Sequence, residues 1–352
     1  MEPLIAIYSA AEIFLALFIS FSNLLVIWVF VKVRRIRSPT NTYIFSLALT
    51  DFLTGAIGIP VTVYSVVSRA PHAFLPCLAL HIILCMFCTI SLFHLLAIAI
   101  DKYLSICCHC GLLHQRSKHG RARFLIVLAW VFGSGIACLP LFDAFGFASS
   151  TSGNFIGECH FTVVMDYRYL VYVIFFGTII IPSLIIIFCY VSIFHKIKLE
   201  ERHVKCLLRV AERQKRIMKR RKLLRIMIIL VTTYAVTWYP LYIINTIDLF
   251  FPEYHSTAAI TLAAVVLSHV SCAVNPLIYA YGVPGFQHAL RQFFRIGPKS
   301  ETTAFPSCVV PQSKTFDVHS QLYRDVSMIR KESAHFSRNA SMKLPQRAYT
   351  FE

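Results

Sequence analysis

The sequence predicts an all-α membrane protein, a bundle of seven transmembrane helices with a short amphipathic helix after the seventh span. Hydrophobic residues make up 57% of the 352 residues and charged residues only 14%, whereas soluble domains contain about 45–50% and about 25%. The mean hydropathy is +0.65. A water-soluble globule of this size could bury so much apolar surface only with difficulty, so we expect an integral membrane protein.

Seven stretches are long and apolar enough to cross a bilayer, which takes about 20 helical residues. The second contains one charged residue, Asp51, and the first, third, fourth, fifth and sixth contain no Asp, Glu, Lys or Arg. In order, the predicted spans are 13–31, 38–68, 77–100, 124–142, 169–195, 226–247 and 255–281. No internal repeat is visible, which argues against a repeat-built transporter.

The connections between the spans predict the orientation of the chain. All 34 Lys and Arg residues except Arg69 and Arg168 fall on one side of the predicted membrane. Because basic residues collect in cytoplasmic loops, we expect that side to face the cytosol and the N-terminus to be extracellular. The net charge of +17 is therefore interpreted as a topology signal, and no nucleic-acid partner is expected.

The chain divides into four predicted segments. They are an extracellular N-terminus (1–8), the seven-helix domain (9–283), an amphipathic helix on the inner leaflet (284–298) and a disordered cytoplasmic tail (299–352). The third segment alternates Phe and Leu with Arg291 and Arg295 at helical spacing, which is typical of a helix lying on a membrane surface. The fourth is polar, rich in Ser and Thr and without periodicity.

Each predicted span carries a short motif, and the motifs occur in a fixed order. They are Ser22-Asn23, SLALTDFL around Asp51, Asp101-Lys102-Tyr103, Trp130 with Pro140, Pro182 with Tyr190, Trp238-Tyr239-Pro240 and Asn275-Pro276-Leu277-Ile278-Tyr279. Over residues 10–296 this set resembles the rhodopsin-like G protein-coupled receptors. The resemblance implies a plasma-membrane receptor rather than an enzyme, with heterotrimeric G proteins, arrestin and receptor kinases as partners.

Three longer segments resemble adenosine receptors within that family. They are CHFTVVMDYRYLVYVIFF (159–176), WYPLYIIN (238–245) and VLSHVSCAVNPLIYAY (266–281). The resemblance implies a receptor for extracellular adenosine or a related purine nucleoside that signals through G proteins to adenylate cyclase.

The same resemblance implies a ligand site, whose residues are Phe161, Asn245, Leu241, Ser268, His269, Glu12 and Cys88. A side-chain amide carries the donor and acceptor that match the edge of adenine, and an aromatic ring can stack on a purine. A hydroxyl can bond ribose, and a carboxylate can orient an imidazole. Each residue also has an ordinary interpretation: Asn245 as an interhelical bond, Glu12 as a snorkelling side chain and His269 as a satisfied interior imidazole.

Three further features are implied by the family. One is a disulfide between Cys77 and Cys159, both predicted to be extracellular. Another is a sodium ion held by Asp51, Ser91 and Asn275, although Ser271 stands where relatives usually have Asn. The third is a switch that contacts the G protein, formed by Asp101, Lys102, Tyr103, Tyr190, Trp238, Asn275 and Tyr279. No other cofactor is expected.

The inner switch departs from the family pattern, because Lys102 replaces an arginine. Lysine presents a point charge where arginine presents a planar fork of donors, so the exchange is not conservative. Arg220 also stands where many relatives have an acidic residue, and we expect Lys102 and Arg220 to repel each other. Our hypothesis is altered coupling, either as raised basal activity or as weakened engagement of the G protein.

The predicted ligand site departs as well. Different side chains stand where relatives have Thr, Gln, His or Ser, Asn and Glu, namely Cys88, Thr89, Tyr242, Ile174 and Thr162 in that order. Fewer polar contacts to a ribose are therefore expected. The alternatives are low agonist affinity, a modified purine, or an orphan receptor for a different small or lipid ligand.

Other functional classes fit the sequence less well. An amine receptor needs an Asp where Leu84 stands, and an opsin needs a Lys where His269 stands. A transporter or channel would show broken helices or a continuous polar lining. The cluster Cys107, Cys108, His109 and Cys110 is spaced too tightly for a tetrahedral zinc site, and palmitoylation at the membrane edge is the better interpretation.

Overall fold

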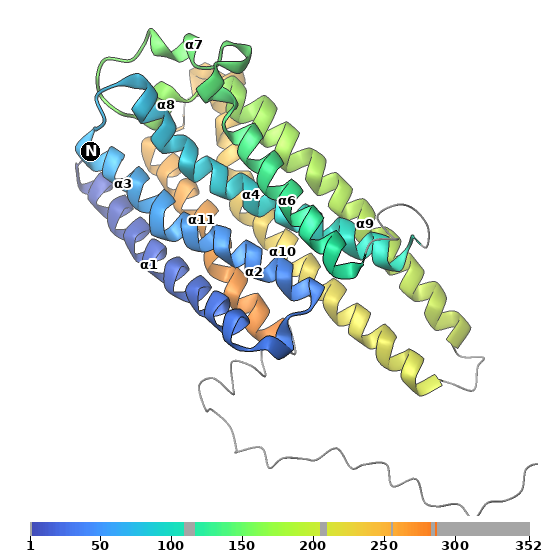
Figure 1. Ribbon diagram of the computed structural model, residues 1–352. Helices are drawn as coiled ribbons and strands as arrows, with labels where there is room; N and C mark the ends of the chain where they lie inside the picture. The colour runs from blue at the N-terminus through green and yellow to red at the C-terminus, as the bar shows by residue number, and fades with distance from the viewer. Residues whose placement is uncertain (1, 109–116, 205–209, 255, 283–285, 287–352) are drawn as a thin grey trace, which may run out of the picture. The chain divides into compact units, whose positions relative to one another are not determined.

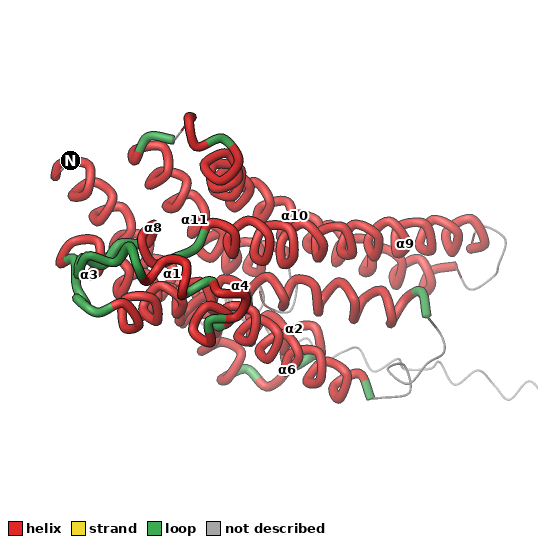
Figure 2. Tube along the Cα trace, turned by 90° about the horizontal axis from the view of Figure 1, so that it is seen from above, coloured by secondary structure: helices red, strands yellow, loops and turns green. Residues whose placement is uncertain are grey.

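The computed structural model describes residues 2–108, 117–204, 210–254, 256–282 and 286. All regular structure among these residues is helical (Figure 2). Seven helical segments are long and apolar enough to cross a membrane, which confirms the predicted fold class. They are Glu2–Lys32, Pro39–Ser68, Phe74–Ile106, Lys118–Ala137, Tyr169–Glu201, Arg220–Phe250 and Ala258–Ala280.

Several predictions lie outside the described residues. The tail 299–352 is one of them, and the amphipathic helix 284–298 has only Phe286 described. Two residues of the Cys107–Cys110 cluster, His109 and Cys110, also lie outside the described residues. These assignments stay predictions.

The first span is a single helix, α1 (Glu2–Lys32), which starts well before the predicted residue 13. Pro3 does not prevent this early start, because a proline is tolerated in the first turn of a helix. One face of α1 is exposed and apolar, as Phe14, Leu17 and Phe21 show, and this suits contact with lipid. We call the end of the bundle at which α1 begins the N-terminal end, and the opposite end, where α10 (Val210–Phe250) begins, the basic end.

The second span consists of α2 (Pro39–Leu53), a π-helical turn (Thr54–Gly58) and α3 (Ile59–Ser68). The Ser38 side chain caps α2 by accepting a hydrogen bond from the Asn41 amide. Within the π-helical turn, Gly55 packs so closely on α1 that a Cβ would lie 2.8 Å from Ile19. The turn therefore needs glycine at this crossing.

The third span, α4 (Phe74–Ile106), is central and contacts α2, α6 (Lys118–Ala137) and α9 (Ile181–Val204). α6 ends before the predicted residue 142, because Pro140 cannot continue the helix and the chain turns into a 3₁₀ segment, Leu139–Phe142. The hydroxyl of Tyr169 donates to the carbonyl of Ala137 (3.1 Å) and so caps the end of α6.

The fifth span begins with a π-helical segment, Tyr169–Ile180, and continues as α9. The sixth and seventh spans, α10 and α11 (Ala258–Gly282), each contain a proline, Pro240 and Pro276. Proline removes a backbone hydrogen bond and kinks a helix. Figures 1 and 2 show that α9 and α10 extend side by side beyond the other helices at the basic end.

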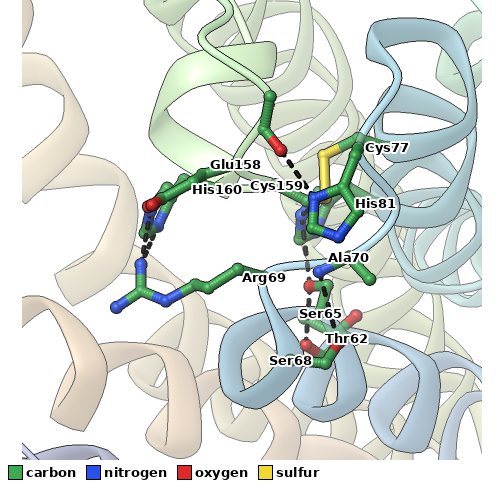
Figure 3. Close-up of a disulfide and its surroundings, with 12 residues drawn as sticks. Thr62, Ser65, Ser68, Arg69, Ala70, Cys77, His81, Glu158, Cys159 and His160 are labelled. Carbon is green, nitrogen blue, oxygen red and sulfur yellow. Dashed lines mark hydrogen bonds and ion pairs between the residues drawn. A yellow bond between two sulfur atoms is a disulfide. The ribbon is translucent and has the colours of Figure 1, made fainter.

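The connection between the fourth and fifth spans lies over the N-terminal end of the bundle (Figure 1). It contains two single-turn helices, α7 (Ser149–Ser152) and α8 (Phe161–Val164). A disulfide joins Cys159 to Cys77 on α4, with a Cα–Cα distance of 5.6 Å (Figure 3). The implied pairing is therefore present in the structure, and it anchors the segment that leads into α8.

Candidate ligand-binding site

A cavity of about 190 Å³ opens between the helices at the N-terminal end, and most of its wall is apolar. Its walls come from α1, α3, α4, α8, the π-helical segment 169–180, α10 and α11. All of the ligand residues that the sequence predicted, except Glu12, line it: Cys88, Phe161, Leu241, Asn245, Ser268 and His269. Residues from four separate helices thus share one enclosure.

Glu12 lies directly behind His269 and contacts it. The Nδ1 atom of His269 lies 3.0 and 2.9 Å from the two carboxylate oxygens of Glu12, and the two residues are 3% and 0% exposed. The snorkelling interpretation of Glu12 is therefore wrong. Because a carboxylate oxygen accepts, Nδ1 carries a hydrogen, and the imidazole is held by its far side while it lines the cavity.

Asn245 is 6% exposed and lines the cavity from α10. Among the described residues its amide makes no hydrogen bond, so the structure does not support the alternative of an interhelical bond. A buried amide without a protein partner is costly, and a ligand that offers both a donor and an acceptor would satisfy it.

Phe161 forms part of the cavity wall near its opening and is 38% exposed. It is the first residue of α8 and follows Cys159 by two positions, so the disulfide helps to hold its backbone. Its ring meets the ring of His81 edge to face, with a centroid distance of 5.4 Å. An aromatic ring is therefore held at the cavity wall by a tethered segment.

Ser268 donates its hydroxyl hydrogen to the carbonyl of Val265 (2.6 Å). The oxygen can still accept, so a ligand hydroxyl would have to be the donor in any bond to Ser268. Thr89 likewise gives its hydrogen to its own helix, at the carbonyl of Cys85 (2.7 Å). Both local bonds reduce the donors available to a ligand, in agreement with the predicted loss of polar contacts.

A column of aromatic rings on α10 forms the floor of the cavity. Tyr234, Trp238 and Tyr242 stack at centroid distances of 5.6 and 6.0 Å, and the indole of Trp238 donates to Ser271 (3.1 Å). Helical spacing of four residues places the three rings on one face. A ligand that touches this column would contact the helix containing Pro240 directly.

Asp51 lies below that floor and is fully buried. Its carboxylate accepts hydrogen bonds from Ser91 (2.9 Å) and Asn275 (2.8 Å). A cavity of about 10 Å³ adjoins it, and Ser271 also lines this cavity, which is about the size of one water-sized sphere. Carboxylate, hydroxyl and amide oxygens suit a small hard cation, so the residues present fit the implied sodium ion.

At the basic end, Asp101 binds two cations. Its carboxylate lies 2.9 Å from the Lys102 ammonium and 2.8 Å from the Arg121 guanidinium, and Lys102 also donates to Thr40 (2.8 Å). Of the other predicted switch residues, Tyr190 and Tyr279 are buried and Tyr103 packs against Phe188. The role of Arg121 was missed, because it lies three residues before the predicted span 124–142 and was counted with the basic residues of the connection; the structure includes it in α6.

Lys102 and Arg220 do not share a partner. Arg220 pairs instead with Glu200 of α9 at 2.7 Å, and the neighbouring Arg221 pairs with Glu201. The expected repulsion between Lys102 and Arg220 is therefore compensated, because Lys102 pairs with Asp101 and Arg220 with Glu200.

At the N-terminal end, Arg168 on the outer connection forms an ion pair. Arg168 lies 2.7 Å from Asp166, and Ser150 donates to the same carboxylate (2.6 Å). Burial opposes ionisation of Asp166, but these hydrogen bonds outweigh it and hold the pKa of the carboxyl below its ordinary value. This network fixes the start of the fifth span next to the cavity.

Comparisons with known proteins find similarity to seven-transmembrane receptors. The family model described as "7 transmembrane receptor (rhodopsin family)" matches residues 22–279. Adenosine receptor A2a of Equus caballus is 29% identical over 303 residues, which cover 82% of this chain and 72% of the relative. Adenosine receptor A2a of Homo sapiens is 28% identical with the same coverage. Adenosine receptor A2b of Gallus gallus is 28% identical over 345 residues, covering 90% of this chain and 96% of the relative.

Proposed function

The chain belongs to the rhodopsin family of seven-transmembrane receptors, and from that premise we propose that its ligand is extracellular adenosine or a related purine nucleoside. As a member of that family it is a multi-pass membrane receptor and not an enzyme. Beyond membership of the family, we propose the class of ligand, the coupling to a G protein and adenylate cyclase, and the extracellular position of the N-terminus.

One observation carries the ligand proposal: Phe161, Asn245, Ser268 and His269 line a single cavity. The Asn245 amide would bond the amino group and a ring nitrogen of adenine. The purine would stack on Phe161. The ribose would lie against Ser268 and the imidazole that Glu12 holds in place. The names of the similar receptors from Equus caballus and Gallus gallus agree with a nucleoside ligand.

The signal would pass through the aromatic column on α10. A ligand that favours one packing of Trp238 shifts the receptor between two states, and the kink at Pro240 would let the basic end of α10 move. A heterotrimeric G protein acting on adenylate cyclase would bind there, beside Lys102, Tyr190 and Tyr279. This arrangement requires a plasma-membrane location with the N-terminus outside, and it makes the tail the substrate of receptor kinases and the site of arrestin binding.

We further propose an allosteric sodium ion at Asp51, held with Ser91 and Asn275. A bound ion would stabilise the state of the receptor that binds adenosine more weakly. The affinity for adenosine should therefore be lower in NaCl than in choline chloride. Equal affinities in the two salts would contradict the proposed binding of sodium at Asp51.

The ligand proposal is tested by adenosine binding and cAMP responses in cells expressing the receptor and Asn245→Ala. Loss of a two-point amide contact should weaken adenosine about 5- to 150-fold. Thr246→Ala is the matched control, because Thr246 is the next residue and bonds its own helix at Tyr242 (2.6 Å). A full response retained in Asn245→Ala would refute the pocket assignment.

A second candidate is a receptor for a different small or lipid ligand. The apolar wall favours it, since Ile174, Leu170 and Tyr242 offer little to a sugar. No adenosine response from receptor at the cell surface, together with a response to an apolar ligand, would favour this candidate. A receptor that binds adenosine but barely signals would instead point to weakened coupling at Lys102.

A further inference from the structure

Two aromatic side chains project from the connection that follows α6. Phe142 and Phe145 are 82% and 83% exposed, although phenylalanine is among the side chains most often buried in folded proteins. They lie in two short 3₁₀ segments, Leu139–Phe142 and Ala144–Gly146, directly after α6 ends. Neither ring lines the ligand cavity, so the proposed function leaves both unexplained.

The backbone at Phe145 has a conformation that a bulky residue rarely adopts. Its φ of 58° and ψ of 19° are left-handed, a region that disfavours aromatic residues. A fold keeps such a conformation where it positions a side chain that has a use. The ring touches Phe147 at a centroid distance of 5.8 Å, but because most of it is exposed, packing within the chain is not that use.

The backbone around this residue is held in place on both sides. Before it, the carboxylate of Asp143 accepts hydrogen bonds from the amides of Ala148 (2.9 Å) and Ser149 (2.8 Å). After it, the buried ring of Phe147 meets that of Tyr169 at a centroid distance of 5.5 Å. The two exposed rings are therefore presented by a fixed turn.

The length of α6 places this turn at the level of a membrane surface. α6 has 20 residues, which extend about 30 Å and match the hydrocarbon thickness of a bilayer. Its first residue, Lys118, is exposed and basic, so we expect Ala137 at the opposite end to reach the other surface. Phe142 and Phe145 follow within eight residues of Ala137.

The surface next to the turn is apolar and almost without charge. On α6 the side chains of Val127, Val131 and Phe132 are exposed, which suits contact with lipid tails. The stretch 124–157 contains one charged residue, Asp143, whose carboxylate is used within the turn. Phenylalanine is a side chain that membrane-surface segments bury at the head-group boundary, and without basic residues the stretch does not attract anionic lipids.

We propose that the turn 139–147 is a lipid-contact site, at which Phe142 and Phe145 insert into the head-group boundary of the leaflet at the N-terminal end of the bundle. The lipid chemistry that fits is a zwitterionic phospholipid such as phosphatidylcholine. The contact anchors a turn whose buried side packs on Tyr169, the first residue of the fifth span. This inference does not depend on which ligand occupies the cavity.

Spin labels on introduced cysteines test the depth of the two positions. Full-length Phe142→Cys and Phe145→Cys are labelled, reconstituted in phosphatidylcholine vesicles and exposed to oxygen, which concentrates in lipid, and to a water-soluble nickel chelate. The ratio of oxygen to nickel collisions should exceed that of Ser152→Cys about threefold, because side chains at the head-group boundary lie about 5–10 Å deep. The signal of labelled wild type is subtracted, because the chain has free cysteines of its own.

Ser152→Cys is the matched control, because Ser152 is exposed in the same connection, on α7 over the N-terminal end of the bundle (Figure 1). Ratios at Phe142→Cys and Phe145→Cys that equal the control would place both rings in water and overturn the proposal. Few collisions with either reagent would overturn it too, because they would indicate a protein contact, such as a second copy of the chain.

A photoreactive phosphatidylcholine tests the unaltered chain, so that the result does not depend on the folding of a variant. After illumination in vesicles that contain this lipid, mass spectrometry should find lipid adducts on the peptide 139–147. The exposed residues of α7 should carry none. Adducts on lipid-facing residues of α6, such as Val131, without any on 139–147 would overturn the proposal.

Discussion

The two ends of the bundle each bury a carboxylate, and they satisfy it differently. At the N-terminal end Glu12 has one partner, the imidazole of His269, which also forms cavity wall. At the basic end Asp101 has two basic partners, Lys102 and Arg121. In the first arrangement His269 remains available for contact with a ligand in the cavity. In the second, the carboxylate of Asp101 has more than one basic partner.

This difference explains how the chain tolerates its departure at Lys102. Arg121 binds Asp101 from α6 independently of the residue at position 102. Lys102 then uses its remaining donors on Thr40 of α2. Asp101 therefore has a hydrogen-bond partner whichever basic residue stands at position 102. The hypothesis of altered coupling concerns the position of the Lys102 ammonium group instead.

The largest effect is expected from Arg121→Ala, which removes one of the two basic partners at the basic end. Asp101 keeps Lys102 but loses a charge-assisted hydrogen bond, which is worth about 1.5–3 kcal/mol, so the melting temperature of the purified receptor should fall by about 3–10 °C. Scanning fluorimetry measures it. Arg123→Ala is the control, because Arg123 is exposed on the same helix. Equal melting temperatures for the two variants would contradict a structural role for Arg121.

Glu12→Gln tests the other end and should have a smaller effect, on ligand binding. The amide keeps the shape of Glu12 but loses the charge that holds His269, and a charge-assisted hydrogen bond of this kind is worth about tenfold in affinity. Competition binding of adenosine measures the change. Glu2→Gln, on the exposed first turn of α1, should bind as wild type, and an unchanged affinity in Glu12→Gln would count against the pair.

Lys102→Arg asks whether the basic end is sensitive to the shape of the cation. A guanidinium can make two bonds to Asp101 where the ammonium makes one, which withdraws charge from Thr40. We expect basal and adenosine-driven cAMP to change about threefold. Dose–response curves that coincide with wild type would end the hypothesis of altered coupling.

The smallest effect is expected at the paired ends of α9 and α10. Glu200 and Arg220 are 30% and 36% exposed along their side chains, and exposed pairs contribute about 0.2–1 kcal/mol. Glu200→Arg should therefore shift the half-maximal adenosine concentration in a cAMP assay about twofold. The double exchange Glu200→Arg with Arg220→Glu should restore it, and a double variant no better than the single one would argue against the contact.

Hydropathy and the distribution of basic residues were sufficient to predict the seven spans, because a bilayer demands long apolar helices. The resemblance supplied the cavity residues. Arg121 and Glu200 were missed because their roles depend on which helix faces them, and a single sequence does not contain that information. The start of α1 and the end of α6 were misplaced because hydropathy marks the membrane interior and not the helix termini.

The π-helical winding of residues 169–180 has a consequence for the evolution of the cavity. Leu170, Ile174 and Thr178 all line it, on a segment whose i→i+5 hydrogen bonds make each turn wider than the 3.6 residues of an α-helix. The winding of this segment therefore decides which of its side chains face the cavity. Deletion of one residue here would change the winding of the segment and turn a different set of side chains towards the ligand. A single-residue deletion could in this way change ligand specificity without altering the other helices.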